Sequence, residues 1–315
     1  MGAFIVRRVI MAVIVVIVVS VIIFLLLQLV PGGDPARAML GLDASQVEVD
    51  ALRQQMWLDK PLVVQYFHWI GNALHGDLGM SLRYRLNVTT LIRQRLPITL
   101  HLAVTAMILA AVIGILGGII CAVKRNSFVD QAISVLANGA VAIPVFWLGI
   151  MGIYLFGLNL HWLPVQGYTP PTQDFWLSTR KIIMPVICIS LPMLAMLTRQ
   201  TRSAMLEVVR QDYVRTAWSK GLTQKRIIAG HALKNAMIPI VTLIGLGVPQ
   251  LFAGSVLVET VFNVPGMGRL LVGAVIDKDF IVTQACVLII AAIITIVNFI
   301  VDISYGLLDP RIRFQ

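Results

Sequence analysis

Six long apolar runs separated by polar gaps dominate this chain. Each run is nearly free of charge, and a helix rises about 1.5 Å per residue, so such runs suit a hydrocarbon core of roughly 30 Å. The runs are Val9–Leu27, Leu100–Val123, Ala132–Leu158, Ile182–Leu197, Met237–Leu257 and Val282–Ile303. The pattern predicts an all-α integral membrane protein with about six transmembrane helices.

The composition supports this prediction. Of the 315 residues, 58% are hydrophobic and only 13% are charged, which excludes an ordinary soluble domain. A net charge of +10 could indicate nucleic-acid binding, but Lys and Arg are gathered in the gaps between runs. Fourteen of them fall in the gaps on one side and four in the short gaps on the other. The positive-inside rule therefore predicts that both termini face the cytoplasm.

Run lengths and gaps divide the chain into segments. Residues 1–30 form a predicted N-terminal transmembrane helix, and 31–96 form a predicted extracytoplasmic segment. Five further transmembrane helices are expected in a core over 97–305, which contains a cytoplasmic loop at 199–236, and 306–315 form a cytoplasmic tail.

The extracytoplasmic segment holds two stretches with apolar residues at near-helical spacing. The first is Ser45 to Leu58, where Val47, Leu52, Met56 and Trp57 recur, and the second is Val63 to Leu74. Both stretches are therefore expected to be amphipathic helices.

Proline and glycine interrupt several runs. Proline removes a backbone donor and glycine lets helices approach closely, so these positions predict kinks and tight helix contacts in a mobile bundle. The positions are Pro144, Pro185, Pro192, Pro249, Gly114, Gly117, Gly118, Gly245 and Gly247.

The inner loop carries the clearest local signals. Asp212 can cap a helix over 213–220, Gly221 can take the left-handed conformation that ends it, and Thr223 can cap a second helix. The loop is thus expected to form two short helices with a corner. Since both ends join membrane helices, force on this corner would reach the fourth and fifth spans.

No catalytic or metal chemistry is predicted. Cys121, Cys188 and Cys286 lie inside apolar runs and are expected to be packing residues. The five histidines are scattered without the spacing that metal ligands on one element need. They are His68, His75, His101, His161 and His231. The chain also has no Gly-x-x-x-x-Gly-Lys-Ser/Thr phosphate loop, so we expect no cofactor site and no enzymatic activity of its own.

The inner loop, read from Asp212 through Lys220, Gly221 and Leu222, resembles the cytoplasmic coupling loop of binding-protein-dependent ABC importer permeases of the dipeptide, oligopeptide and nickel group. The wider superfamily has Glu-Ala-Ala where this chain has Arg215, Thr216 and Ala217, and this departure is typical of that group. Further stretches resemble the same group along nearly the whole chain. They are Leu58 to Leu62, Gly76 to Ser81, Arg95 to Leu100, Trp162 to Pro164, Glu259 to Arg269 and Leu308 to Arg311.

The resemblance implies a type I importer permease fold and a multisubunit transporter. Its other parts would be a homologous second permease subunit, two cytoplasmic ABC ATPase subunits that bind ATP and Mg, and an extracytoplasmic substrate-binding protein. The loop would dock into the ATPase. The implied coupling residues are Asp212, Tyr213, Arg215, Thr216, Ala217, Lys220, Gly221 and Leu222.

Two questions stay open at this level. An ion-gradient-driven secondary transporter is the alternative, although such carriers show repeat symmetry and intramembrane charges that are not evident here. The solute is not specified either, and dipeptides, oligopeptides, glutathione, opines and nickel chelates all remain candidates.

Overall fold

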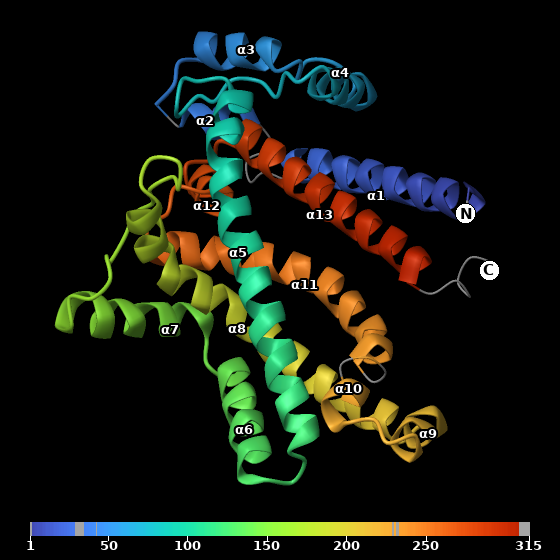
Figure 1. The fold of residues 1–315 in the computed structure, drawn as a ribbon. Coiled ribbons are helices and arrows are strands. Elements are labelled where there is room, and N and C mark those ends of the chain that lie inside the picture. The colour runs from blue at the N-terminus through green and yellow to red at the C-terminus, as the bar shows by residue number, and fades with distance from the viewer. Residues whose placement is uncertain (1, 29–34, 42, 229, 231–232, 309–315) are drawn as a thin grey trace. The chain divides into compact units, whose positions relative to one another are not determined.

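The chain folds almost entirely into helices. The computed structural model describes residues 2–28, 35–41, 43–228, 230 and 233–308, and within these ranges it contains no β-strand (Figure 1). His231 and the terminal stretch Asp309 to Arg311 lie outside the described residues. The helices are α1 (Gly2–Gln28), α2 (Pro35–Leu40), α3 (Gln46–Gln55), α4 (Leu62–Leu74), α5 (Val88–Val123), α6 (Phe128–Ala142), α7 (Val145–Gly152), the π-helix η1 (Ile153–Asn159), α8 (Phe175–Val209), α9 (Asp212–Ser219), α10 (Gln224–Ile227), α11 (Leu233–Val261), α12 (Met267–Ile276) and α13 (Phe280–Leu308).

The six apolar runs correspond to five long helices and one bent pair. By length and composition α1, α5, α8, α11 and α13 can each cross a membrane. The sixth candidate is α6 followed by α7 and η1, which are bent by 101° relative to each other. The prediction of an all-α membrane protein with about six spans is therefore confirmed, and the third apolar run is the bent pair.

Pro144 explains the break. It cannot donate a backbone hydrogen bond, and its ring disfavours helical geometry at the residue before it. Ile143 accordingly has an extended backbone, with φ of −87° and ψ of 127°, and α7 begins directly after Pro144. The prolines of α8 and α11, by contrast, are accommodated inside continuous helices.

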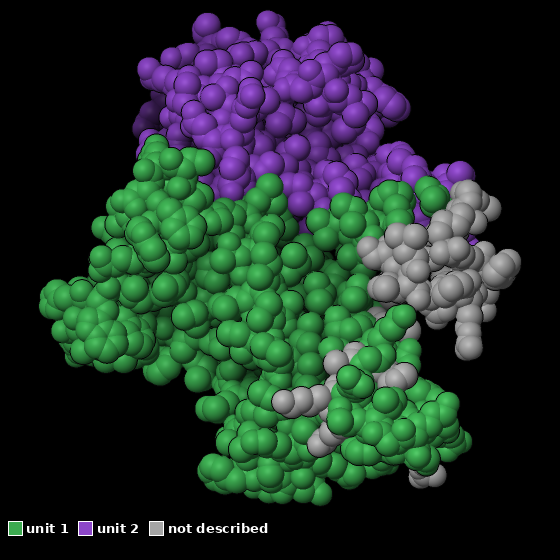
Figure 2. Space-filling view, viewed as in Figure 1, with its two compact units in different colours: residues 1–5, 99–264, 297–315 green, residues 6–98, 265–296 purple. Residues whose placement is uncertain are grey.

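The chain divides into two compact units, which Figure 2 colours separately. Unit 1 comprises Met1–Ile5, Thr99–Val264 and Val297–Gln315, and unit 2 comprises Val6–Ile98 and Pro265–Ile296.

Unit 1 is organised around α8, which packs against α6, α7 and α11. Glycines allow α5 to approach it closely, as predicted. A Cβ atom added at Gly114 would lie 2.9 Å from the Leu194 carbonyl oxygen, and one added at Gly118 would overlap Thr201. This close contact is typical of helix pairs in membranes.

Unit 2 has a core where α5 begins and where α12 meets α13. Leu91, Met267, Leu270 and Cys286 are among its buried residues. A smaller core forms beneath α3, around Val49 and Leu52.

The predicted apolar face of α3 was partly wrong. Val49 and Leu52 are buried, whereas Val47 is 80% exposed. Two residues correspond to about 200° of helix rotation, so Val47 and Val49 cannot share a face. Ser45 and Glu48 form a capping box that fixes the start of this helix.

Candidate functional site: the coupling loop

The predicted corner is present at Gly221. Helix α9 ends with the Leu222 amide donating to the Ala217 carbonyl (3.4 Å) and the Gly221 amide donating to the Trp218 carbonyl (2.9 Å). This pair of bonds is the Schellman motif, which needs a left-handed residue after the helix. Gly221 supplies it with a φ of +77°. The chain then turns into α10, which begins one residue after Thr223 as expected.

The start of α9 differs from the prediction. Asp212 is the first helical residue and not the cap, because the helix starts one residue earlier than expected. Gln211 occupies the N-cap position and its side chain makes no capping bond. The Asp212 carboxylate still lies in the first turn, where it interacts favourably with the helix dipole.

Buried apolar residues attach the corner to the membrane helices. Val214 and Ala217 of α9 and Ile227 of α10 are buried together, with Leu222 and Val208 packed against them. Val208 is near the end of α8 and also packs against a second cluster, made of Ala204, Met205 and Ala236. This second cluster joins α8 to the start of α11. The loop is therefore packed onto both membrane helices that flank it.

The other face of α9 is exposed. Tyr213 and Trp218 are 42% and 47% exposed, and Asp212, Thr216 and Lys220 are exposed beside them. Asn235, at the start of α11, donates a 2.8 Å hydrogen bond to the Tyr213 hydroxyl. Trp218 was not among the predicted coupling residues, although it lies between two of them. The side chains of Arg215 and Lys225 lie outside the described part of the chain.

A partly buried ion pair lies elsewhere in unit 1, and the sequence analysis did not find it. Arg202 of α8 donates from Nε and Nη2 to the two carboxylate oxygens of Asp130 on α6, at 2.7 and 2.8 Å. The Asn126 amide also donates to this carboxylate, at 3.0 Å. The Asp130 side chain is only 4% exposed. The pair joins the N-terminal end of α6 to the part of α8 that leads into the loop.

The predicted packing role of the cysteines is confirmed, since all three are free thiols buried inside the protein.

Comparisons with known proteins identify the class. Residues 114–314 match the family described as binding-protein-dependent transport system inner membrane component. Residues 1–103 match its companion family, the N-terminal membrane component of such transport systems. The chain therefore belongs to the permeases of binding-protein-dependent ABC importers, which favours this class over the ion-gradient carriers.

Curated relatives place the chain in the peptide group of that family. It is 40% identical to the probable peptide ABC transporter permease of Sinorhizobium fredii, over the full length of both chains. It is also 40% identical to the di/tripeptide transport system permease protein DppB of Pseudomonas aeruginosa, again over both full lengths. The chain is thus an ABC permease of the peptide transport family, and it is embedded in the membrane.

A solved structure supports the fold. The inward-facing methionine ABC transporter MetNI has a chain that aligns with a TM-score of 0.57 and 16% sequence identity. The alignment covers 70% of this chain and 96% of the MetNI chain.

Proposed function

We propose that this chain forms, with a homologous second permease subunit, the translocation pathway of an importer for peptides. Two cytoplasmic ABC ATPase subunits bind ATP and Mg and drive it, and an extracytoplasmic binding protein delivers the peptide. The permease lies in the inner membrane with both termini in the cytoplasm. The names of the relatives, which refer to peptide and di/tripeptide transport, support this choice of solute.

One observation carries the coupling role most directly. The corner at Gly221 is packed against buried apolar residues on one side and exposed on the other. Its inner side is packed through Val208 onto α8 and toward the start of α11. An ATPase that displaced α9 would therefore move the ends of both membrane helices, because packed elements switch position as units.

The exposed side has the chemistry of a docking surface. Tyr213 and Trp218 are aromatic residues of the kind enriched at the centres of protein interfaces. Asp212 and Lys220, at the two ends of α9, add one charge of each sign. We expect the aromatic residues to enter a groove of the ATPase and the charges to fix the orientation of the helix.

Affinity purification from the native membrane tests the assembly. An epitope-tagged chain should recover a second permease and ABC ATPase subunits, identified by mass spectrometry. A Trp218→Ala variant should insert normally but retain less ATPase, since it removes an exposed aromatic anchor. A Trp176→Ala variant, which removes a still more exposed tryptophan (75% against 47%) at the start of α8, is the control and should recover the wild-type amount. Recovery of the wild-type chain without any ATPase would refute the proposal.

A further inference from the structure

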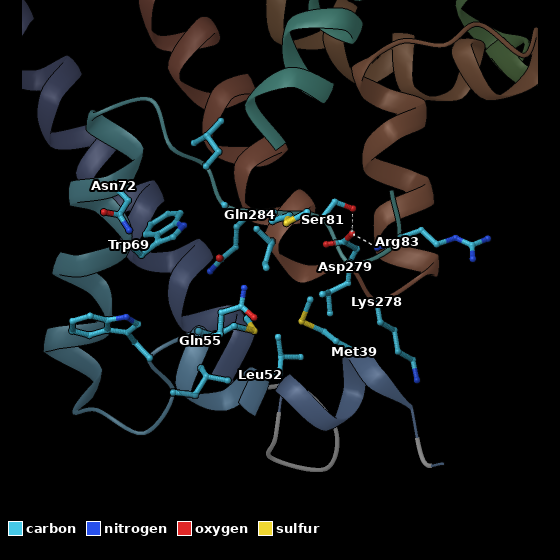
Figure 3. Close-up of a pocket in the computed structure, with 18 of the residues that line it drawn as sticks. Met39, Leu52, Gln55, Trp69, Asn72, Ser81, Arg83, Lys278, Asp279 and Gln284 are labelled. Carbon is cyan, nitrogen blue, oxygen red and sulfur yellow. Dashed lines mark hydrogen bonds between the residues drawn. The ribbon is translucent and has the colours of Figure 1, made fainter. Parts of the chain in front are cut away.

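Unit 2 contains a pocket with a volume of about 710 Å³ (Figure 3). It is formed by α3, α4, the loop that follows α4, and the link between α12 and α13. Pockets that bind small molecules typically measure 300 to 1,000 Å³. All of its lining residues belong to unit 2, either in the predicted extracytoplasmic segment 31–96 or between residues 277 and 284.

A buried amide without a partner faces this pocket. Gln284, the fifth residue of α13, is only 5% exposed, and its Nε2 atom has no hydrogen-bond partner within the described ranges. Figure 3 shows its side chain pointing into the pocket from α13. A buried polar group without a partner costs about 1 to 3 kcal/mol. A ligand carbonyl would supply the missing acceptor.

Three side chains of the pocket, those of Trp57, Arg85 and Lys278, occupy backbone positions of positive φ that favour glycine, and two of them end helices. Lys278 follows α12 with a φ of +56°, and Trp57 follows α3 with a φ of +59°. Each is the left-handed residue of a Schellman motif, closed by the Asp279 amide on the Ala274 carbonyl (2.8 Å) and by the Leu58 amide on the Arg53 carbonyl (2.9 Å). Such positions disfavour bulky side chains, and backbone strain of this kind gathers at functional sites.

Trp57 gains a local contact that offsets this cost, because its ring stacks on His68 with centroids 3.9 Å apart. Lys278 gains no such contact. Its side chain is exposed, and it forms no ion pair with another described residue. Stability of the fold alone therefore does not explain a lysine at this position.

The charged side chains that line the pocket balance in number, with Arg83, Arg85 and Lys278 against Asp77, Asp277 and Asp279, but Lys278 forms no ion pair with another described residue. Asp279 is occupied, because it accepts hydrogen bonds from the Ser81 hydroxyl (2.5 Å) and the Arg83 amide (3.4 Å). Arg83 pairs with Asp277 at 3.4 Å. Lys278 remains available to bind an anion.

We propose that this pocket binds a short peptide. Lys278 binds the terminal carboxylate, and Gln284 donates to a backbone carbonyl. Met39, Met56 and Met80 line the apolar part of the pocket, and flexible methionines accommodate peptide side chains of different shapes. The inference rests on the proposed transport of peptides and adds a peptide site on the permease itself.

Calorimetric titration of the purified full-length chain in lipid nanodiscs tests the proposal. Trialanine is the probe, and trialanine amide, which lacks the carboxylate, is its matched control. We expect the amide to bind about tenfold to a hundredfold more weakly, since hydrogen bonds to charged groups contribute about 1.5 to 3 kcal/mol. Lys278→Gly should weaken trialanine binding to a similar extent and abolish the preference for the carboxylate. Gln284→Leu should weaken binding of both probes about fivefold.

Neither variant should lower the thermal stability of the chain. Lys278→Gly relieves a strained backbone position, and Gln284→Leu removes a buried amide that has no partner. Asn126→Gly makes the same backbone change at another position of positive φ, outside the pocket. Gln54→Leu makes the same side-chain change at an exposed position outside the lining. Both controls should keep wild-type affinity.

Equal affinity for the two trialanine probes, or no loss of affinity in Lys278→Gly and Gln284→Leu, would overturn the pocket proposal. Peptide uptake by the complete transporter, measured in parallel, reports on the proposed function separately. Normal uptake together with absent binding to the isolated chain contradicts the pocket alone. If the complete wild-type transporter takes up no peptide, that result contradicts the proposed transport function itself.

Discussion

Arg202 holds Asp130 through two parallel hydrogen bonds, and so fixes α6 to α8 just before α8 leads into the corner at Gly221. Removing Arg202 leaves the buried Asp130 carboxylate without its partner, and because the Arg202 side chain is itself 32% exposed, we expect a cost of about 1.5 to 3 kcal/mol, that of a hydrogen bond to a charged group. Arg202→Leu should therefore lower the free energy of unfolding by an amount of this order, measured by chemical denaturation in detergent micelles.

The exposed pair of Asp50 and Arg53 is the control for this prediction. Both side chains are well exposed, at 50% and 39%, and such surface pairs contribute little. Arg53→Leu should leave the unfolding free energy nearly unchanged. Equal effects of the two substitutions would contradict the structural role of the Asp130 pair.

Gly221 should be needed for coupling. Valine is strained at a φ of +77°, so Gly221→Val should distort the corner while the membrane helices still insert. Substrate-stimulated ATP hydrolysis by the assembled transporter should then be largely lost. Asparagine tolerates left-handed geometry better, so Gly221→Asn should retain most of the stimulation. No space restriction complicates the comparison, because a Cβ atom at Gly221 would meet nothing within 4 Å.

The contact between α5 and α8 should be intolerant of a methyl group. A Cβ atom at Gly118 would overlap Thr201 and lie 2.6 Å from the Thr198 carbonyl oxygen. Gly118→Ala should therefore destabilise the chain by about 1 to 3 kcal/mol, as overpacking does. Gly139 lies in α6 with nothing within 4 Å of its added Cβ, so Gly139→Ala should be neutral or stabilising. Thermal unfolding of both variants tests this prediction. An equal loss of stability in Gly118→Ala and Gly139→Ala would show that helix packing at Gly118 is not responsible.

A buried carboxylate in α11 depends on a threonine of α5. Glu259 is fully buried, and the Thr99 hydroxyl donates to its Oε1 atom at 2.6 Å. Thr99→Val keeps the shape but removes this donor, so it should cost about 1.5 to 3 kcal/mol of unfolding free energy. Thr105 donates only to a carbonyl of its own helix, so Thr105→Val should have a much smaller effect. A loss in Thr99→Val no larger than in Thr105→Val would argue against this contact.

Local signals in the sequence were sufficient for the spans and for the corner. Apolar run length depends on the thickness of the bilayer, and the left-handed turn at Gly221 depends on a single residue type, so each is encoded within a short stretch of chain. The close approach at Gly118 was also predicted, because small residues have a general role in membrane helix packing.

Long-range relationships could not be read in the same way. Asp130 and Arg202 are 72 residues apart, and nothing in their local sequence specifies that they meet. The pocket likewise combines α3 with the link between α12 and α13. The face of α3 was misassigned because several spacings are compatible with one helix, and only the buried position of Val49 decides between them.

The break at Pro144 has a consequence for the environment of this region. Helix α6 has 15 residues and is about 22 Å long, which is too short to cross the hydrocarbon core without α7. The carbonyl groups at its end lose their intrahelical donors, and lipid tails cannot replace those donors within a hydrocarbon core. Ile143 and Phe146, on either side of the break, are exposed on the single chain. Acyl chains must therefore be kept away from this bend, either by water or by the surface of a neighbouring subunit.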